Sequence, residues 1–173
     1  MGITAERRQF IADIANDEWI GRIDRSMPDS EFDVLSDEWQ RRTDEFLRDT
    51  TDSAELHLFV KLWNWDGGIE EIRKVINHPH CEAATALMVY WRMQPEFYSR
   101  LKASHKMTES EQENFELLKQ VELRFVSGDF PVGDCHYDPA DDNDRLATIR
   151  STPIHDWIPR RMFESVPNAA NVE

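Results

Sequence analysis

The sequence is short of cysteine and of long apolar runs. Only two of its 173 residues are cysteines, Cys81 and Cys135, and no basic-then-apolar segment follows Met1. Both features predict a reducing, cytoplasmic location rather than secretion. No stretch reaches the roughly 18 apolar residues needed to cross a bilayer, and anionic membrane surfaces repel an acidic chain, so no membrane partner is expected.

Positive charge is scarce as well. The chain has 20 Lys and Arg against 34 Asp and Glu, a formal net charge of −14. Nucleic acid is therefore excluded as a partner, because a phosphate backbone binds a basic surface. The acids concentrate at the ends: residues 1–60 hold 15 acids and 7 bases, and residues 128–173 hold 9 and 4. Such ends either attract a basic protein or simply keep the chain well solvated.

Common catalytic and metal-binding signatures are missing too. There is no Gly-x-x-x-x-Gly-Lys loop, no Gly-x-Ser-x-Gly elbow and no His-Glu-x-x-His helix. Five possible zinc ligands occur, but their spacing matches no paired pattern; they are His78, His80, Cys81, Cys135 and His136. The aspartates after residue 137 lack the order of a calcium loop. The sequence predicts no metal and no cofactor, and it favours a protein that is not an enzyme.

What the sequence does have is helical spacing of apolar residues. The predicted fold class is all-α: a compact multi-helix bundle or a short α-solenoid-like stack with an irregular C-terminal arm. The predicted helices cover 4–23, 28–46, 53–63, 69–77, 81–93, 95–101 and 109–127. We expect one domain over 1–173, made of an N-terminal helical layer (1–50), a central core (54–128) and a docked irregular tail (129–173).

Several residues predict where these helices begin and which face they bury. Thr4 is a candidate cap, and capping boxes are predicted at Asp52 with Glu55 and at Thr108 with Glu111. The second helix has an apolar stripe of Phe32, Leu35, Trp39 and Phe46. The stretch 83–91 is apolar on nearly every side and predicts the central helix of the core. The tail offers apolar contacts at Ile154, Trp157, Ile158, Met162 and Phe163.

The centre of the chain contains a series of short motifs. Glu55-Leu56-His57 is followed by Asn64-Trp65-Asp66-Gly67-Gly68, then by Asn77-His78-Pro79-His80-Cys81 and by Thr85-Ala86-Leu87-Met88. In this order they resemble the bacterial domain of unknown function family 4274, although Gly67 replaces an acid of its turn and His78 is inserted in its Asn-Pro step. Similar pieces recur at 125–130, 137–139 and 158–159, so the resemblance covers about residues 54 to 164.

This resemblance implies a small bacterial cytoplasmic protein. Some members of the family are associated with toxin and immunity systems, in which one protein neutralises a partner toxin. The family motif residues are His57, Asn64, Trp65, Asp66, Gly68 and Cys81. We interpret them as structural: Asp66 caps the helix after Gly67, Trp65 fills a corner between helices, and Cys81 is a small buried residue.

The leading hypothesis is a non-enzymatic, acidic protein of the immunity or antitoxin type that binds a basic partner, such as a bacterial toxin. The candidate contacts are Asp33, Asp37, Glu38, Asp44, Asp138, Asp141, Asp142, Asp144 and Trp19. Trp19 could equally be buried. The alternatives are an enzyme or small-ligand protein with a pocket near Asn64, Asp66 and His57, and a scaffold that joins other proteins.

Overall fold

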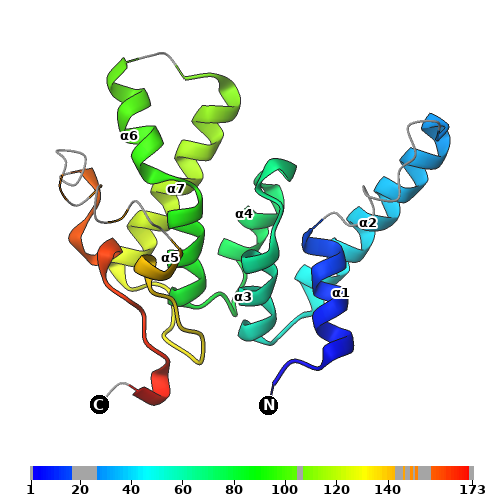
Figure 1. Ribbon diagram of the computed structural model, residues 1–173, viewed down its shortest axis with the longest axis horizontal. Helices are drawn as coiled ribbons and strands as arrows, with labels where there is room; N and C mark the ends of the chain where they lie inside the picture. Colours follow the sequence, from blue (N-terminus) through cyan, green and yellow to red (C-terminus); the bar gives the residue numbers. More distant parts are fainter. Residues whose placement is uncertain are drawn as a thin grey trace. The chain divides into compact units, whose positions relative to one another are not determined.

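The computed structural model describes residues 2–16, 27–104, 107–142, 146, 149, 151 and 157–171, with the backbone alone at 99, 100, 102–104, 142 and 171. The chain divides into two compact units, Met1–His80 and Cys81–Glu173. Every regular element in the described residues is a helix, which confirms the all-α fold class (Figure 1). No described helix is long and apolar enough to cross a membrane.

In the described residues of the first unit there are four α-helices and one short 3-10 turn. These are α1 (Ala5–Ala15), α2 (Asp29–Asp49), α3 (Ser53–Leu62), η2 (Trp65–Gly67) and α4 (Glu70–Ile76). Helix α1 packs on α2 and α3, and α4 packs on α2 and α3. Their shared core holds Ile11, Ile14, Phe46, Leu47, Leu56, Phe59, Val60, Trp63, Ile72, Val75 and Ile76.

Local signals predicted how α1 and α3 begin, with one exception at Glu55. The Thr4 hydroxyl accepts the Arg7 N–H at 3.2 Å, as predicted. Asp52 accepts the Ala54 N–H, but Glu55 does not complete a capping box. Its carboxylate instead pairs with the Arg7 guanidinium at 2.6 Å and accepts the Thr50 hydroxyl at 2.8 Å. A charged partner on another helix outcompetes the local backbone donor.

The first helix is also shorter than predicted. It ends at Ala15, with Asn16 as its C-terminal cap, rather than near residue 23. Asn16 and Asp17 are poor helix formers because their side chains compete for backbone hydrogen bonds. Residues 17–26, including Trp19, lie outside the described residues.

The second unit is built around a buried helix. It contains α5 (Ala83–Arg92), α6 (Pro95–Ser104), α7 (Glu109–Ser127), α8 (Pro139–Asp142), η4 (Arg160–Phe163) and η5 (Ala169–Asn171). Every residue from 83 to 91 is buried, which confirms the predicted central helix. The Thr108–Glu111 capping box forms at the start of α7, and Gly128 ends it in the left-handed conformation at φ 78°.

The segment after α7 packs back on this unit. The backbones of Tyr137 and Val166 exchange two hydrogen bonds of 3.1 and 2.9 Å. The Trp91 indole donates to the Met162 carbonyl at 2.7 Å, with Ile158, Met162 and Phe163 all buried. Trp157 is half exposed and Ile154 lies outside the described residues. The three-part division of a single domain stays a prediction, since these contacts describe each unit separately.

Candidate functional site

The first turns of α2 form an exposed acidic surface. Every described side chain from 28 to 34 is exposed, and no Lys or Arg occurs between 27 and 40. The predicted contacts Asp33 and Asp37 are both exposed there and have no ion pair with another described residue. These two carboxylates are therefore exposed and are not paired with any cation in the described part of the chain.

The other two acids predicted on this helix are already paired. Glu38 and Glu45 flank the Arg41 guanidinium at 2.8 and 2.7 Å, and the hydrogen bond from Arg41 lowers the pKa of Glu38. Asp44 binds the Lys74 ammonium at 2.7 Å, which ties α2 to α4. Of the four predicted acids, Asp33 and Asp37 have no ion pair with a described residue, whereas Glu38 and Asp44, further along the helix, each have one.

Two apolar side chains accompany the unpaired acids. Phe32 is 41% exposed and Val34 is 67% exposed. The sequence placed Phe32 on the buried stripe, and the structure shows that this expectation is wrong. Helix α2 extends past α1 at this end (Figure 1), so the stripe becomes buried only at Phe46. The surface therefore combines carboxylates with exposed apolar side chains, the mixture that anchors protein partners.

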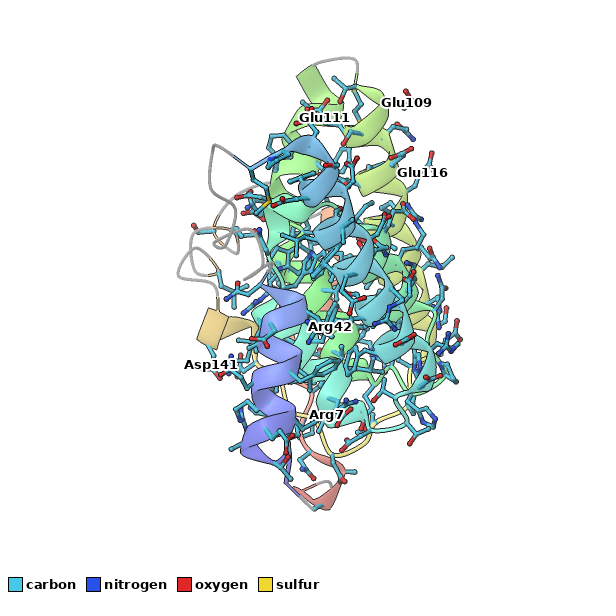
Figure 2. The ribbon with its side chains drawn as sticks, turned by 90° about the vertical axis from the view of Figure 1, so that its right-hand side faces the viewer. Arg7, Arg42, Glu109, Glu111, Glu116 and Asp141 are labelled. Atoms are coloured by element: carbon cyan, nitrogen blue, oxygen red, sulfur yellow. The ribbon has the colours of Figure 1, made fainter. Side chains whose placement is uncertain are left out.

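The other end of α2 is firmly held. The Arg7 guanidinium lies over the rings of Phe10 and Phe46, at 5.0 and 5.2 Å from their centres, while it pairs with Glu55. Arg42 lies over the Phe10 ring as well, and Figure 2 shows both arginines. The hydrogen bond from Arg7 lowers the pKa of Glu55. These contacts join α1, α2 and α3 around one ion pair.

The predicted acidic contacts at residues 138–144 are described only in part. The Asp138 carboxylate accepts the Ala140 N–H at 2.8 Å and so begins α8, while Asp141 is exposed (Figure 2). The side chain of Asp142 and all of Asp144 lie outside the described residues, as does Trp19. Asp138 has a structural role here, and Asp141 alone is shown at the surface.

The Asn64-Trp65-Asp66 turn is organised by Asn64 rather than Asp66. The Asn64 side chain accepts the Asp66 N–H at 3.2 Å, and its backbone N–H donates to the Ala15 carbonyl at 2.8 Å. Helix α4 has Ile69 at its cap position and no side-chain cap, so the predicted capping role of Asp66 is wrong. Asn64 is the cap residue of the short helix η2, and its side chain accepts the backbone N–H of Asp66 there.

The remaining motif residues fit positions in the fold. Gly68 has φ 96° and ψ −173°, a conformation essentially restricted to glycine. Trp65 is half-buried and His57 lies half-buried on α3. Cys81 is buried, which raises the pKa of its thiol to about 12, so the thiolate is scarce at neutral pH. Among the described residues, no three His, Cys, Asp or Glu side chains gather as a metal site.

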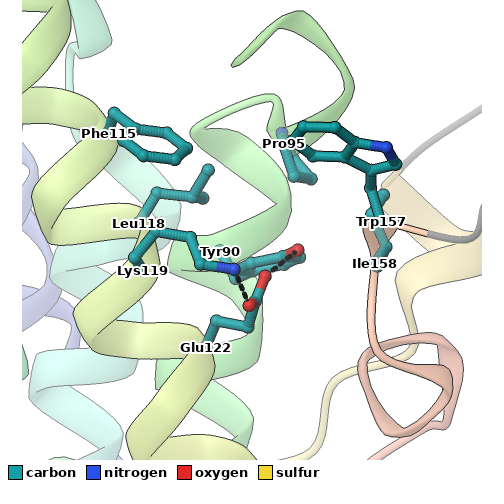
Figure 3. Close-up of a pocket in the computed structure, with 8 residues that line it drawn as sticks. All are labelled: Tyr90, Pro95, Phe115, Leu118, Lys119, Glu122, Trp157 and Ile158. Atoms are coloured by element: carbon teal, nitrogen blue, oxygen red, sulfur yellow. Dashed lines mark hydrogen bonds and ion pairs between the residues drawn. The ribbon is translucent and has the colours of Figure 1, made fainter. Parts of the chain in front are cut away.

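The second unit contains a small pocket that the sequence did not suggest. Its floor is the Glu122 carboxylate, which accepts the Tyr90 hydroxyl at 3.0 Å and pairs with the Lys119 ammonium (Figure 3). Phe115, Leu118, Pro95, Trp157 and Ile158 form its walls.

One signal for this pocket was present in the sequence. Glu122 stands four residues after Leu118 and three before Phe125, so an acid interrupts the buried stripe of α7. A buried acid at such a position has a specific partner. The sequence could not identify Tyr90 or Trp157 as neighbours of Glu122, because both are far from it along the chain.

A family comparison bears on the middle of the chain. Residues 51–126 match the model of a domain of unknown function family, DUF4274. The resemblance stated from the motifs is therefore confirmed over this range, from before α3 into the last turn of α7. No curated protein and no solved structure matches the chain. The exposed acids Asp33 and Asp37 lie before the matched range, so the match does not extend to the acidic surface of α2.

Proposed function

We propose that the protein is a non-enzymatic, acidic binding protein of the immunity or antitoxin type, which acts in the cytoplasm by binding a basic protein partner such as a bacterial toxin. The observation that carries the proposal is the α2 surface, defined as residues 28–38, in which every side chain but Leu35 and Ser36 is exposed. It holds five acids and no base, and Asp33 and Asp37 are unpaired among the described residues.

Charge and apolar contact have separate tasks on this surface. Unpaired carboxylates attract a cationic partner and raise the rate of encounter, an effect that salt weakens. Phe32 and Val34 supply apolar area that loses contact with water once the partner is seated. Charge steering together with an apolar anchor favours a protein partner over a free metabolite.

Two experiments test the function in the cell and in solution. A basic, toxin-like reading frame beside the gene is expressed alone and together with this protein, and growth rescue is expected only with co-expression. Affinity capture from the native host then isolates the complex, which should weaken strongly between low and moderate salt. Rescue without a direct complex contradicts neutralisation by binding.

A charge-reversal pair assigns the binding surface. Asp33→Lys with Asp37→Lys should weaken the captured complex at least about tenfold, because each change replaces attraction with repulsion. The matched control, Glu113→Lys with Glu116→Lys on α7, makes the same change of charge at exposed positions and should have a much smaller effect. Equal effects of the two pairs would show that only net charge matters and that α2 is not the site.

A variant at Asp66 addresses the rival class. Asp66 is exposed and its carboxylate has no structural bond in the turn, so Asp66→Ala should fold normally and keep rescue intact. Loss of function in this folded variant, with no protein partner recovered, would instead support a small-ligand or enzymatic role near Asn64, Asp66 and His57.

A further inference from the structure

The end of the first unit is held by the ring of His78. This residue follows α4, and its backbone N–H donates to the Val75 carbonyl at 3.0 Å. Its ring nitrogen Nδ1 accepts the backbone N–H of His80 at 3.1 Å. His80 is the last residue of the first unit, Met1–His80. One side chain therefore fixes the backbone where the first unit ends.

The same ring is bonded to the end of α2. It forms a hydrogen bond with the backbone of Leu47. Leu47 lies in the last turn of α2, where the carbonyls have no partner within the helix. Because Nδ1 is an acceptor, Nε2 is the nitrogen that carries the hydrogen and donates it to the Leu47 carbonyl. The neutral ring thus makes one bond with each nitrogen, and it ties His80 to α2.

The surroundings of the ring favour its neutral form. Burial lowers the pKa of His78 most, and the His80 ring, whose centre lies 5.6 Å away, lowers the pKa further. The hydrogen bond to Leu47 raises the pKa without reversing this direction. The contribution of His78 to stability is therefore present above the unfolded value near 6.5 and is lost as pH falls through the folded value.

The other charges on the two neighbouring helices are balanced. All charged side chains in the last two turns of α2 and on α4 form ion pairs: Glu45–Arg41, Arg48–Asp49, Glu70–Arg73, and Lys74 with both Asp44 and Glu71. With these charges paired, His80 is the charged neighbour that acts on the pKa of His78.

We propose that His78 is a pH-sensitive switch, which holds the end of the first unit at neutral pH and releases it in acid. Protonation places a hydrogen on Nδ1, which then no longer accepts the His80 N–H. The ring keeps its bond to Leu47, because the negative end of the α2 dipole favours an imidazolium. The backbone at His80 therefore loosens while α2 and α4 stay packed, and the chain that leads into the second unit becomes less constrained.

Nuclear magnetic resonance of the full chain, labelled with ¹⁵N, tests the geometry first. At pH 8 the ring of His78 should have a hydrogen on Nε2 and none on Nδ1. As pH falls, the ring should titrate below the pKa that the same residue has in the urea-unfolded chain. The opposite tautomer would overturn the proposal, since an Nδ1 that carries a hydrogen does not accept the His80 N–H.

Hydrogen exchange at the His80 amide tests the switch itself. Its protection, corrected for the intrinsic effect of pH on exchange, should fall at least about fivefold between pH 8 and pH 5. Equal protection at both pH values would overturn the proposal.

Two variants assign the effect to one ring. His78→Ala should lose the protection at pH 8, and the pH dependence with it. The matched control His80→Gln keeps the backbone N–H and removes the second ring, so it should keep both. A pH dependence that persists in His78→Ala and disappears in His80→Gln would contradict the switch. The switch needs no partner, so its failure would leave the proposed function untouched.

Discussion

Helices α2 and α7, the longest in the described residues, share an amphipathic pattern and differ in their surroundings. Both are amphipathic, and each has two acids in its first turn. Helix α7 starts with a complete capping box, and its Phe115 packs near the Tyr98 ring of α6. Helix α2 starts at Pro28 without a side-chain cap, and its first fully buried residue is Thr43. Helical spacing alone therefore does not show which half of a helix the fold covers.

This difference assigns different roles to the two helices. Most helical stability in proteins comes from packing an apolar face. Helix α7 has buried residues from Leu117 onward, whereas α2 has its buried residues only from Thr43 onward, after Trp39 has stacked on Trp63. The first turns of α2 are therefore the part of this helix that the described residues cover least.

The largest effect on stability is expected in the buried half of α7. Leu117→Ala should lower the free energy of unfolding by about 2–5 kcal/mol, because Leu117 is fully buried and its removal leaves a cavity. Urea denaturation followed by circular dichroism measures the loss. A loss below about 1 kcal/mol would contradict the packing described for α7.

A smaller, pH-dependent effect is expected at the anchored end of α2. Glu55→Gln should cost about 1–3 kcal/mol at pH 7, because it removes a partly buried ion pair and leaves Arg7 without it. The folded state lowers the pKa of Glu55, so this contribution is present above the unfolded value near 4.5 and is lost as pH falls through the folded value. Denaturation at pH 7 and pH 3 should show the difference between wild type and variant shrinking. A difference that grows at pH 3 would contradict the assignment.

The capping box of α7 gives the next effect. Thr108→Ala should destabilise the protein by about 1 kcal/mol, since the Glu111 N–H at the helix start loses the Thr108 hydroxyl that accepts it. Thermal unfolding measures this loss of stability. The control is Ser110→Ala, which changes an exposed residue two positions after Thr108. The same melting temperature for both variants would mean that the first turn of α7 is frayed like an uncapped one.

The smallest effect is expected on the exposed start of α2. Val34→Ser should change the free energy of unfolding by no more than about 0.5 kcal/mol, because this side chain is 67% exposed, and Phe32→Ser, at 41% exposed, by no more than about 1 kcal/mol. The same variants should weaken the complex with the basic partner. A large loss of stability in either variant would show that this end of α2 is covered in the folded protein.

The sequence predicted the local features of the fold well. The Thr108–Glu111 box and the start of a helix at Pro95 depend on neighbouring residues, and both are confirmed. The same local reasoning failed where a distant residue competes. Glu55 was assigned to its own helix cap, yet it binds Arg7, 48 positions earlier. Phe32 was assigned to the core from its helical spacing. That spacing does not show how far the neighbouring helices extend along α2, and Phe32 is 41% exposed.

The candidate sites show the same division. The exposed acids Asp33 and Asp37 could be found from charge and helical phase alone. The pocket could not, because it joins Tyr90 of α5 and Glu122 of α7 to Trp157, which lies 35 residues beyond Glu122. An acid on a buried stripe was visible in the sequence, but its partners depend on tertiary packing.

Hydrogen exchange on the complex tests the central claim most directly. In the free protein the amides of residues 29–38 should exchange much faster than those of 117–125, since little of the fold covers them. Adding the captured basic partner should slow exchange in 29–38 at least about tenfold, because binding protects this helix. Unchanged exchange in 29–38 within a saturated complex would contradict the claim that the acidic start of α2 is where the partner binds.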